Sequence, residues 1–90
     1  MKLGQKVMTR RILERYERNR DFARDVAHSL GLYLKNDWGD ISENDKALND
    51  ESVASGTGGI MGAYETCDGR IWIKTEHDRS VTTILFPDEY

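Results

Sequence analysis

His77 is the residue whose type and neighbours most readily suggest catalysis, because it stands between two acids, Glu76 and Asp78. An imidazole beside carboxylates can act as a general base or bind a metal ion. The local sequence, however, predicts a turn at this position, and the only other histidine, His28, falls in a separate predicted helix. A zinc site needs three or four convergent ligands. We therefore expect His77 to be a solvated turn residue.

Cys67 and the glycine-rich run at residues 56–59 are the other candidates for chemistry. Cys67 is the only cysteine, so the chain has no internal disulfide and no cysteine-rich metal site. A reactive thiolate needs a nearby positive charge, whereas the next residue is the acid Asp68. The glycine run precedes a predicted strand, whereas a phosphate-binding loop follows one. These features predict a protein that is not an enzyme and has no catalytic residue, metal site or cofactor.

Length and composition describe one ordinary globular domain. The chain has 90 residues, of which 38% are hydrophobic and 32% are charged. No apolar run approaches the ~18 residues of a membrane-spanning helix, and the first residues do not resemble a signal peptide. We expect a single domain over residues 1–90 that does not contact a membrane and works in a reducing cytoplasm.

The net charge of −3 is unevenly distributed along the chain. Residues 1–24 carry eight basic and three acidic residues, whereas residues 25–90 carry five basic and thirteen acidic ones. The basic start has three interpretations: it binds nucleic acid, it binds an acidic protein, or it pairs with acids of this same chain. The candidate residues are Arg11, Arg15 and Arg18. The acidic remainder would repel nucleic acid and disfavours direct binding to it.

Helical periodicity dominates the first part of the chain, over about residues 5–55. Apolar residues at helical spacing predict one amphipathic helix over residues 5–18, which includes Met8, and a second one starting near Phe22. Asp21 and Asn19 compete to cap the second helix, which ends at Gly31 or near Asn36. A capping box at residues 42–45 begins a third helix, over about 43–54, which is poor in apolar residues.

Strand periodicity replaces helical periodicity in the last third of the chain. Residues 60–66, 70–76 and 80–86 alternate between apolar and polar side chains, and Asp68-Gly69 is a strong turn signal. We expect a three-stranded antiparallel meander over about 60–86, in which Tyr64 pairs with Ile73 and Ile73 pairs with Ile84. The predicted fold class is α+β, with two or three helices packed on one face of the meander.

The alternation directs Trp72 away from the helices, onto the outer face of the predicted sheet. Four residues are expected near it on this face: Met61, Lys74, Val81 and Leu85. Two interpretations remain open. Either the loop after the second helix or the third helix covers this patch, or the patch is exposed and binds a protein. Unpaired edge strands also make a homodimer an open alternative.

Three runs of sequence resemble a known group of small proteins. They are Asp-Trp-Gly-Asp at residues 37–40, Gly-Arg-Ile-Trp-Ile at 69–73 and TEHDRSVTTILFPDEY at 75–90. Together with the acidic third helix, they are similar to proteins carried on plasmids, conjugative elements and phages of gut and other bacteria. These are labelled "plasmid-related protein" or "type I restriction subunit M". The resemblance implies an origin on a mobile element and carries no established activity.

The methyltransferase label does not fit this chain. Amino-methyltransferases hold their target base with an Asn/Asp-Pro-Pro-aromatic loop, and Pro87 is the only proline here. Ninety residues also cannot form the cofactor-binding fold of those enzymes.

The expected function is therefore binding. We expect a small non-catalytic protein that masks a surface of a host defence nucleoprotein complex, as an anti-CRISPR or anti-restriction inhibitor. An acidic body can occupy a basic nucleic-acid channel by imitating phosphate charge. The alternative is a DNA-binding regulator of plasmid maintenance that uses Arg11, Arg15 and Arg18 on phosphates.

Overall fold

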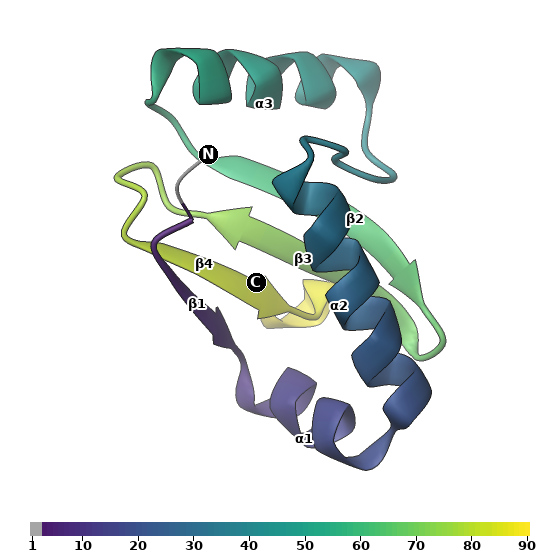
Figure 1. Ribbon diagram of the computed structural model, residues 1–90. Helices are drawn as coiled ribbons and strands as arrows, with labels where there is room; N and C mark the ends of the chain where they lie inside the picture. Colours follow the sequence, from purple (N-terminus) through teal and green to yellow (C-terminus); the bar gives the residue numbers. More distant parts are fainter. Residues whose placement is uncertain (1–2) are drawn as a thin grey trace.

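A computed structural model describes residues 3–90 as an α+β fold, in which a long helix crosses one face of a four-stranded sheet (Figure 1). In chain order the elements are β1 (Gln5–Met8), α1 (Arg10–Arg18), α2 (Arg20–Leu34), α3 (Glu43–Ser55), β2 (Ile60–Thr66), β3 (Gly69–Thr75), β4 (Val81–Leu85) and the 3₁₀ helix η1 (Pro87–Glu89). The predicted α+β class is confirmed, but the sheet is mixed and has a fourth strand.

The fourth strand is β1, which the sequence analysis wrongly assigned to a helix over residues 5–18. β1 lies parallel to β4, with Val7 opposite Thr83 and Met8 opposite Ile84. Thr9 separates the strand from α1, because its side chain accepts a hydrogen bond from the Ile12 amide as an N-cap. A four-residue strand is stabilised by pairing with a distant segment, and helical periodicity in a local window does not detect such pairing.

The sheet has the order β1-β4-β3-β2, and its last three strands form the predicted antiparallel meander. Ile73 lies opposite Ile84, as predicted. Tyr64 lies opposite Ile71 rather than Ile73, so the predicted register between β2 and β3 was wrong by two residues. A shift of two residues leaves every side chain on its predicted face, because side chains alternate with a period of two.

The hydrophobic core fills the space between α2 and the inner face of the sheet. α2 contributes Phe22, Val26 and Tyr33, and α1 adds Ile12. The buried residues opposite them are the strand residues Ile60, Tyr64, Ile71, Ile73 and Ile84, and Phe86 directly after β4. This packing gives the sheet one inner face that α2 covers and one outer face without an α-helix across it (Figure 1).

The helix ends explain how the chain turns between elements. Asn19 ends α1 and caps α2, since its side chain accepts a hydrogen bond from the Phe22 amide at 3.1 Å. Gly31 lies inside α2, which continues to Leu34. Ser42 caps α3 as predicted, and Gly56 ends it with a positive φ of 74°.

Three hydroxyl groups form a buried chain between α2, the sheet and the start of the polypeptide. The Thr82 hydroxyl donates to the Leu3 carbonyl at 2.6 Å and lies 2.8 Å from the Thr75 hydroxyl. The Thr75 hydroxyl lies 2.6 Å from that of Tyr33. Buried polar groups require such partners. These three hydrogen-bonded hydroxyl groups therefore fix α2 against β3 and β4.

We predict that the Tyr33 hydroxyl makes stability fall at alkaline pH. Desolvation by burial raises the pKa of Tyr33 to about 12, whereas an unfolded tyrosine has a pKa of about 10. Unfolding then releases a proton between these two values. The Tyr33 contribution is fully present below about pH 10, and the free energy of unfolding falls above it by about 1.4 kcal/mol per pH unit.

Urea unfolding, followed by circular dichroism between about pH 9 and 11, measures this slope. The Tyr33→Phe variant should lose free energy less steeply with pH than the wild type, because it has no Tyr33 proton to release. Parallel slopes for the two proteins would contradict the assignment.

Candidate protein-binding face

The outer face of the sheet is the face opposite α2. No α-helix formed by residues 3–90 lies across it, because α2 covers the opposite face and α3 lies beyond the β2 edge (Figure 1). Strand register places side chains of all four strands on this face. They are Gln5, Val7, Met61, Ala63, Glu65, Arg70, Trp72, Lys74, Val81, Thr83 and Leu85.

The end of the chain partly covers this face, which the sequence analysis did not predict. η1 folds back, and the ring of Tyr90 contacts Trp72 edge-on, with ring centres 5.5 Å apart. The Lys74 ammonium lies 4.8 Å from the centre of the Tyr90 ring. Leu85, expected on an exposed patch, is only 5% exposed, and Trp72 is half-buried. Tyr90 of the chain end thus contacts Trp72, and the loop after α2 also reaches this face, where Asp40 pairs with Arg70.

Two contacts at the other side of η1 hold it in place. The Glu89 carboxylate accepts hydrogen bonds from the Thr9 hydroxyl at 3.1 Å and from the Phe86 amide at 3.0 Å. The same Thr9 caps α1, so the chain end is tied to the start of the first helix. The hydrogen bond between Thr9 and Glu89 thus helps to hold Tyr90 on the outer face.

A groove of about 480 Å³ opens on this face between α3 and the chain end. Ile41 and Leu48 form its wall on the α3 side, Met61 and Lys74 lie on the strands, and Tyr90 closes the far side. Two apolar residues of the groove are largely uncovered, since Leu48 is 53% and Tyr90 is 76% exposed. The volume lies within the range of about 300–1,000 Å³ that is typical of small ligand sites.

Charged groups accompany these apolar side chains. Asp45 and Glu76 bring carboxylates to the groove, and Lys74 forms an ion pair with Glu76 at 3.4 Å. The Lys74 ammonium also lies on the Tyr90 ring, so both of these partners belong to the same domain. The groove therefore combines apolar side chains with carboxylate groups.

The wall formed by α3 is attached by polar contacts. The Asn49 side chain donates to the Met61 carbonyl at 2.8 Å and accepts from the Met61 amide at 3.3 Å. The Trp38 indole donates to the Asp50 carboxylate at 2.9 Å. Trp38 itself is buried in the core. Asn49 thus satisfies the backbone of the edge strand β2, as a neighbouring strand would.

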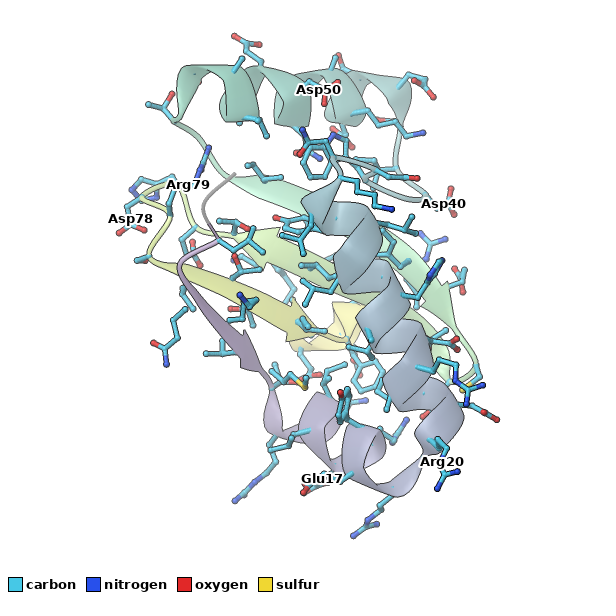
Figure 2. The ribbon with its side chains drawn as sticks, viewed as in Figure 1. Glu17, Arg20, Asp40, Asp50, Asp78 and Arg79 are labelled. Atoms are coloured by element: carbon cyan, nitrogen blue, oxygen red, sulfur yellow. The ribbon has the colours of Figure 1, made fainter. Side chains whose placement is uncertain are left out.

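Arg79 holds the C-terminal part of α3. Its guanidinium donates to the Ser52 carbonyl at 2.8 Å, near the helix C-terminus, where a positive charge is favourable. Figure 2 shows Arg79 reaching from the β3–β4 turn toward the end of α3. The groove is therefore bounded by a helix that is held at its middle, through Asn49 and Asp50, and near its C-terminus, through Ser52.

Two basic residues of α1 form ion pairs with acids near the end of the chain and in the β2–β3 turn. Arg11 pairs with Asp88 at 3.0 Å, and Arg15 pairs with Asp68. Both guanidinium groups also lie over the Phe86 ring, at 4.9 and 5.3 Å from its centre. Within residues 3–90, no ion pair includes Arg18, which is exposed. Two of the three candidate arginines are therefore engaged with the chain's own acids.

His77 and Cys67 are far apart in the fold. His77 is exposed in the β3–β4 turn at the groove, and Cys67 is exposed in the β2–β3 turn. Desolvation, together with the Asp25 carboxylate, raises the pKa of the Cys67 thiol above its usual value, which lowers its reactivity. Among residues 3–90, no group of three His, Cys, Asp or Glu side chains is arranged to hold a metal ion.

Sequence reasoning found part of the groove and missed the rest. Met61 and Lys74 line it, while Val81 lies half-buried on the same sheet face. Ile41, Leu48 and Tyr90 were not predicted as candidate contacts, because their place depends on where α3 and the chain end fold. The signal for Leu48 is its position as one of few large apolar residues in an otherwise polar helix.

Comparisons of this chain with protein-family models, with curated proteins and with solved structures found no match. None of the helices in the described part of the chain has the length and apolar character needed to cross a membrane.

We predict that Tyr90→Ala uncovers Trp72. Loss of the edge-to-face pair should lower the free energy of unfolding by about 1 kcal/mol. It should also shift the tryptophan emission to longer wavelength and increase its quenching by acrylamide. Asp88→Ala, a change of an exposed residue in the same segment, is the matched control for fluorescence. Unchanged quenching in Tyr90→Ala would contradict the described cover.

Proposed function

We propose that this chain is a small non-catalytic protein that binds a protein partner through its outer face, with the groove receiving an apolar side chain. The observation that carries this proposal is the meeting of Leu48, Met61 and Tyr90 in one open groove. Binding energy at protein interfaces concentrates where aromatic and aliphatic side chains line such a hollow. The proposed binding surface extends beyond the groove to Lys74, Trp72 and Val81. Leu85 is buried beneath this surface.

We further propose that the partner is a bacterial defence nuclease complex, of CRISPR or restriction type, in the cytoplasm. The resemblance to mobile-element proteins supports this class of partner. The charge of the chain supports it as well, because Arg11 and Arg15 are neutralised by internal acids. Outside these two pairs, residues 25–90 still carry eleven acidic and five basic residues, and an acidic surface suits a channel built for phosphates.

The proposal is tested by phage plating on bacteria that carry one defence system and express this chain. Two leucines provide a matched pair, since Leu48 in the groove and Leu34 at the end of α2 are 53% and 51% exposed. Glutamine preserves helix propensity at both sites. We expect the wild type and Leu34→Gln to restore plating, and Leu48→Gln to reduce the restoration about tenfold or more. Equal activity of the two variants would contradict a role for the groove.

The alternative function, a DNA-binding regulator, has less support from the contacts. Arg11 and Arg15 already bind Asp88 and Asp68, so only Arg18 of the proposed trio is free of such a pair among residues 3–90. Binding to duplex DNA that weakens steeply with salt and is lost in Arg18→Ala would favour this alternative.

A further inference from the structure

The two edges of the sheet differ in how their backbone groups are satisfied. At the β2 edge, Asn49 bonds the backbone of Met61, and the Trp38 carbonyl and the Asp40 amide bond the backbone of Ala63. At the β1 edge, no comparable contact is present within residues 3–90. An open edge strand is a template for pairing with another strand.

The open groups of β1 belong to Lys6 and Met8. Gln5 and Thr9 donate their amides to the Ser80 and Ile84 carbonyls of the β4 side. Alternate residues of a strand direct their backbone groups to opposite sides. The N–H and C=O groups of Lys6 and Met8 therefore point away from β4, into the free edge.

We infer that two copies of this chain pair through these groups, with their β1 strands antiparallel about a twofold axis at Val7. Lys6 of each copy then lies opposite Met8 of the other, and the two residues exchange backbone hydrogen bonds. The two sheets join into a continuous one. This inference concerns self-association and goes beyond the proposed partner binding.

Charge selects this register over its neighbours. Pairing centred on Val7 sets Lys6 opposite an uncharged methionine, whose side chain the lysine stem can cover. A shift of one pair toward the chain start would set Lys6 opposite Lys6 of the other copy. A shift the other way would set it opposite Arg10. Like charges directly opposite each other destabilise a strand pair, so the register centred on Val7 is preferred.

The antiparallel arrangement also brings opposite charges together outside the strands. In this register Arg10, at the start of α1, lies opposite Gly4 of the second copy. Gly4 packs directly on the backbone of Arg79 and Ser80, next to Asp78. Figure 2 shows Asp78 at this turn, at the opposite end of the molecule from Glu17 and Arg20. Within residues 3–90, neither Arg10 nor Asp78 forms an ion pair, and each is exposed.

The two paired β1 strands are short, and their length limits the expected affinity of the dimer. A stable interface buries about 800 Å² on each partner, and paired four-residue strands bury less. We therefore expect a weak dimer, with a dissociation constant between about 1 μM and 1 mM.

Sedimentation equilibrium over about 1 μM to 1 mM protein measures this association directly. Lys6→Pro removes the outward N–H without removing the Gln5 and Thr9 bonds to the β4 side. Lys6→Ala keeps this N–H and is the matched control. We expect the average mass of wild type and of Lys6→Ala to rise with concentration from the chain mass of 10.3 kDa toward twice that value, and Lys6→Pro to remain a monomer.

A charge exchange provides a second test that does not change the strand. Arg10→Asp and Asp78→Arg should each weaken the dimer about tenfold, and the double variant should restore it. The inference is overturned by a wild type that stays monomeric, by a folded Lys6→Pro that dimerises like Lys6→Ala, or by a double variant that associates no better than the single variants.

Discussion

Phe22→Ala is expected to lower the free energy of unfolding by about 3–5 kcal/mol, the largest effect of any single change considered for this domain. Phe22 is fully buried in the first turn of α2, and its ring centre lies 6.0 Å from that of Phe86. Phe86 in turn supports the guanidinium groups of Arg11 and Arg15. A cavity at Phe22 therefore weakens the contact of both helices with the end of the sheet.

Urea unfolding monitored by circular dichroism measures this loss. Small domains are stable by about 5–15 kcal/mol in total, so the variant should unfold at a much lower urea concentration. Phe22→Leu, which retains most of the volume, is the control and should lose about 1–2 kcal/mol. A loss below about 1 kcal/mol in Phe22→Ala would show that α2 does not pack on the sheet as described.

Asn49→Ala has the second largest expected effect, and it is local to α3. Asn49 is the only buried residue of this helix, and its amide satisfies both backbone groups of Met61. An unsatisfied buried polar group costs about 1–3 kcal/mol. We expect a loss of about 2 kcal/mol, which makes α3 separate from the β2 edge more often.

Hydrogen exchange measures the separation of α3 from the edge. A loss of about 2 kcal/mol corresponds to roughly 30-fold faster exchange of the α3 amides, with little change in α2. Asn44→Ala changes an exposed asparagine of the same helix and is the matched control. Unchanged exchange of α3 in Asn49→Ala would contradict its role as the attachment point.

This prediction bears on function because α3 forms a wall of the groove. If Asn49 holds the wall, Asn49→Ala should also weaken any binding that depends on Leu48, which lies on the same helix. Partner binding and α3 protection should therefore decrease together in this variant.

The inner and outer faces of β2, β3 and β4 were predictable from the sequence, because alternation alone sets them. Ile71 and Ile73 face the core and Trp72 faces outward, even though the predicted register of β2 was shifted by two residues. The start of α3 at Ser42 was predictable for a similar reason, since capping chemistry acts over three residues. For α2 the sequence left Asp21 and Asn19 as alternatives, and Asn19 is the cap.

Features that depend on distant contacts were not predictable in this way. β1 exists because it pairs with β4, which begins more than 70 residues later in the chain. Leu85 is buried, and Trp72 is in contact with Tyr90, whose segment is tied to the other end of the chain by the hydrogen bond between Thr9 and Glu89. No local pattern marks such a contact, so the sequence analysis placed Leu85 on an exposed patch.

The candidate site likewise contains residues that local patterns predicted and residues that they did not. Met61 and Lys74 were assigned to the correct face by strand parity, and they line the groove. Leu48 and Tyr90 complete it, and their positions follow from the docking of α3 and from the fold of the chain end. Sequence patterns thus indicated a binding face, while the groove within it required the three-dimensional arrangement.

Cleavage of DNA by a purified defence nuclease complex, measured against increasing concentrations of this chain, tests the central claim most directly. The account predicts saturable inhibition by the wild type and by Leu34→Gln, and inhibition at least about tenfold weaker for Leu48→Gln. Cleavage that is unaffected by the wild type, or equally inhibited by both variants, would contradict it.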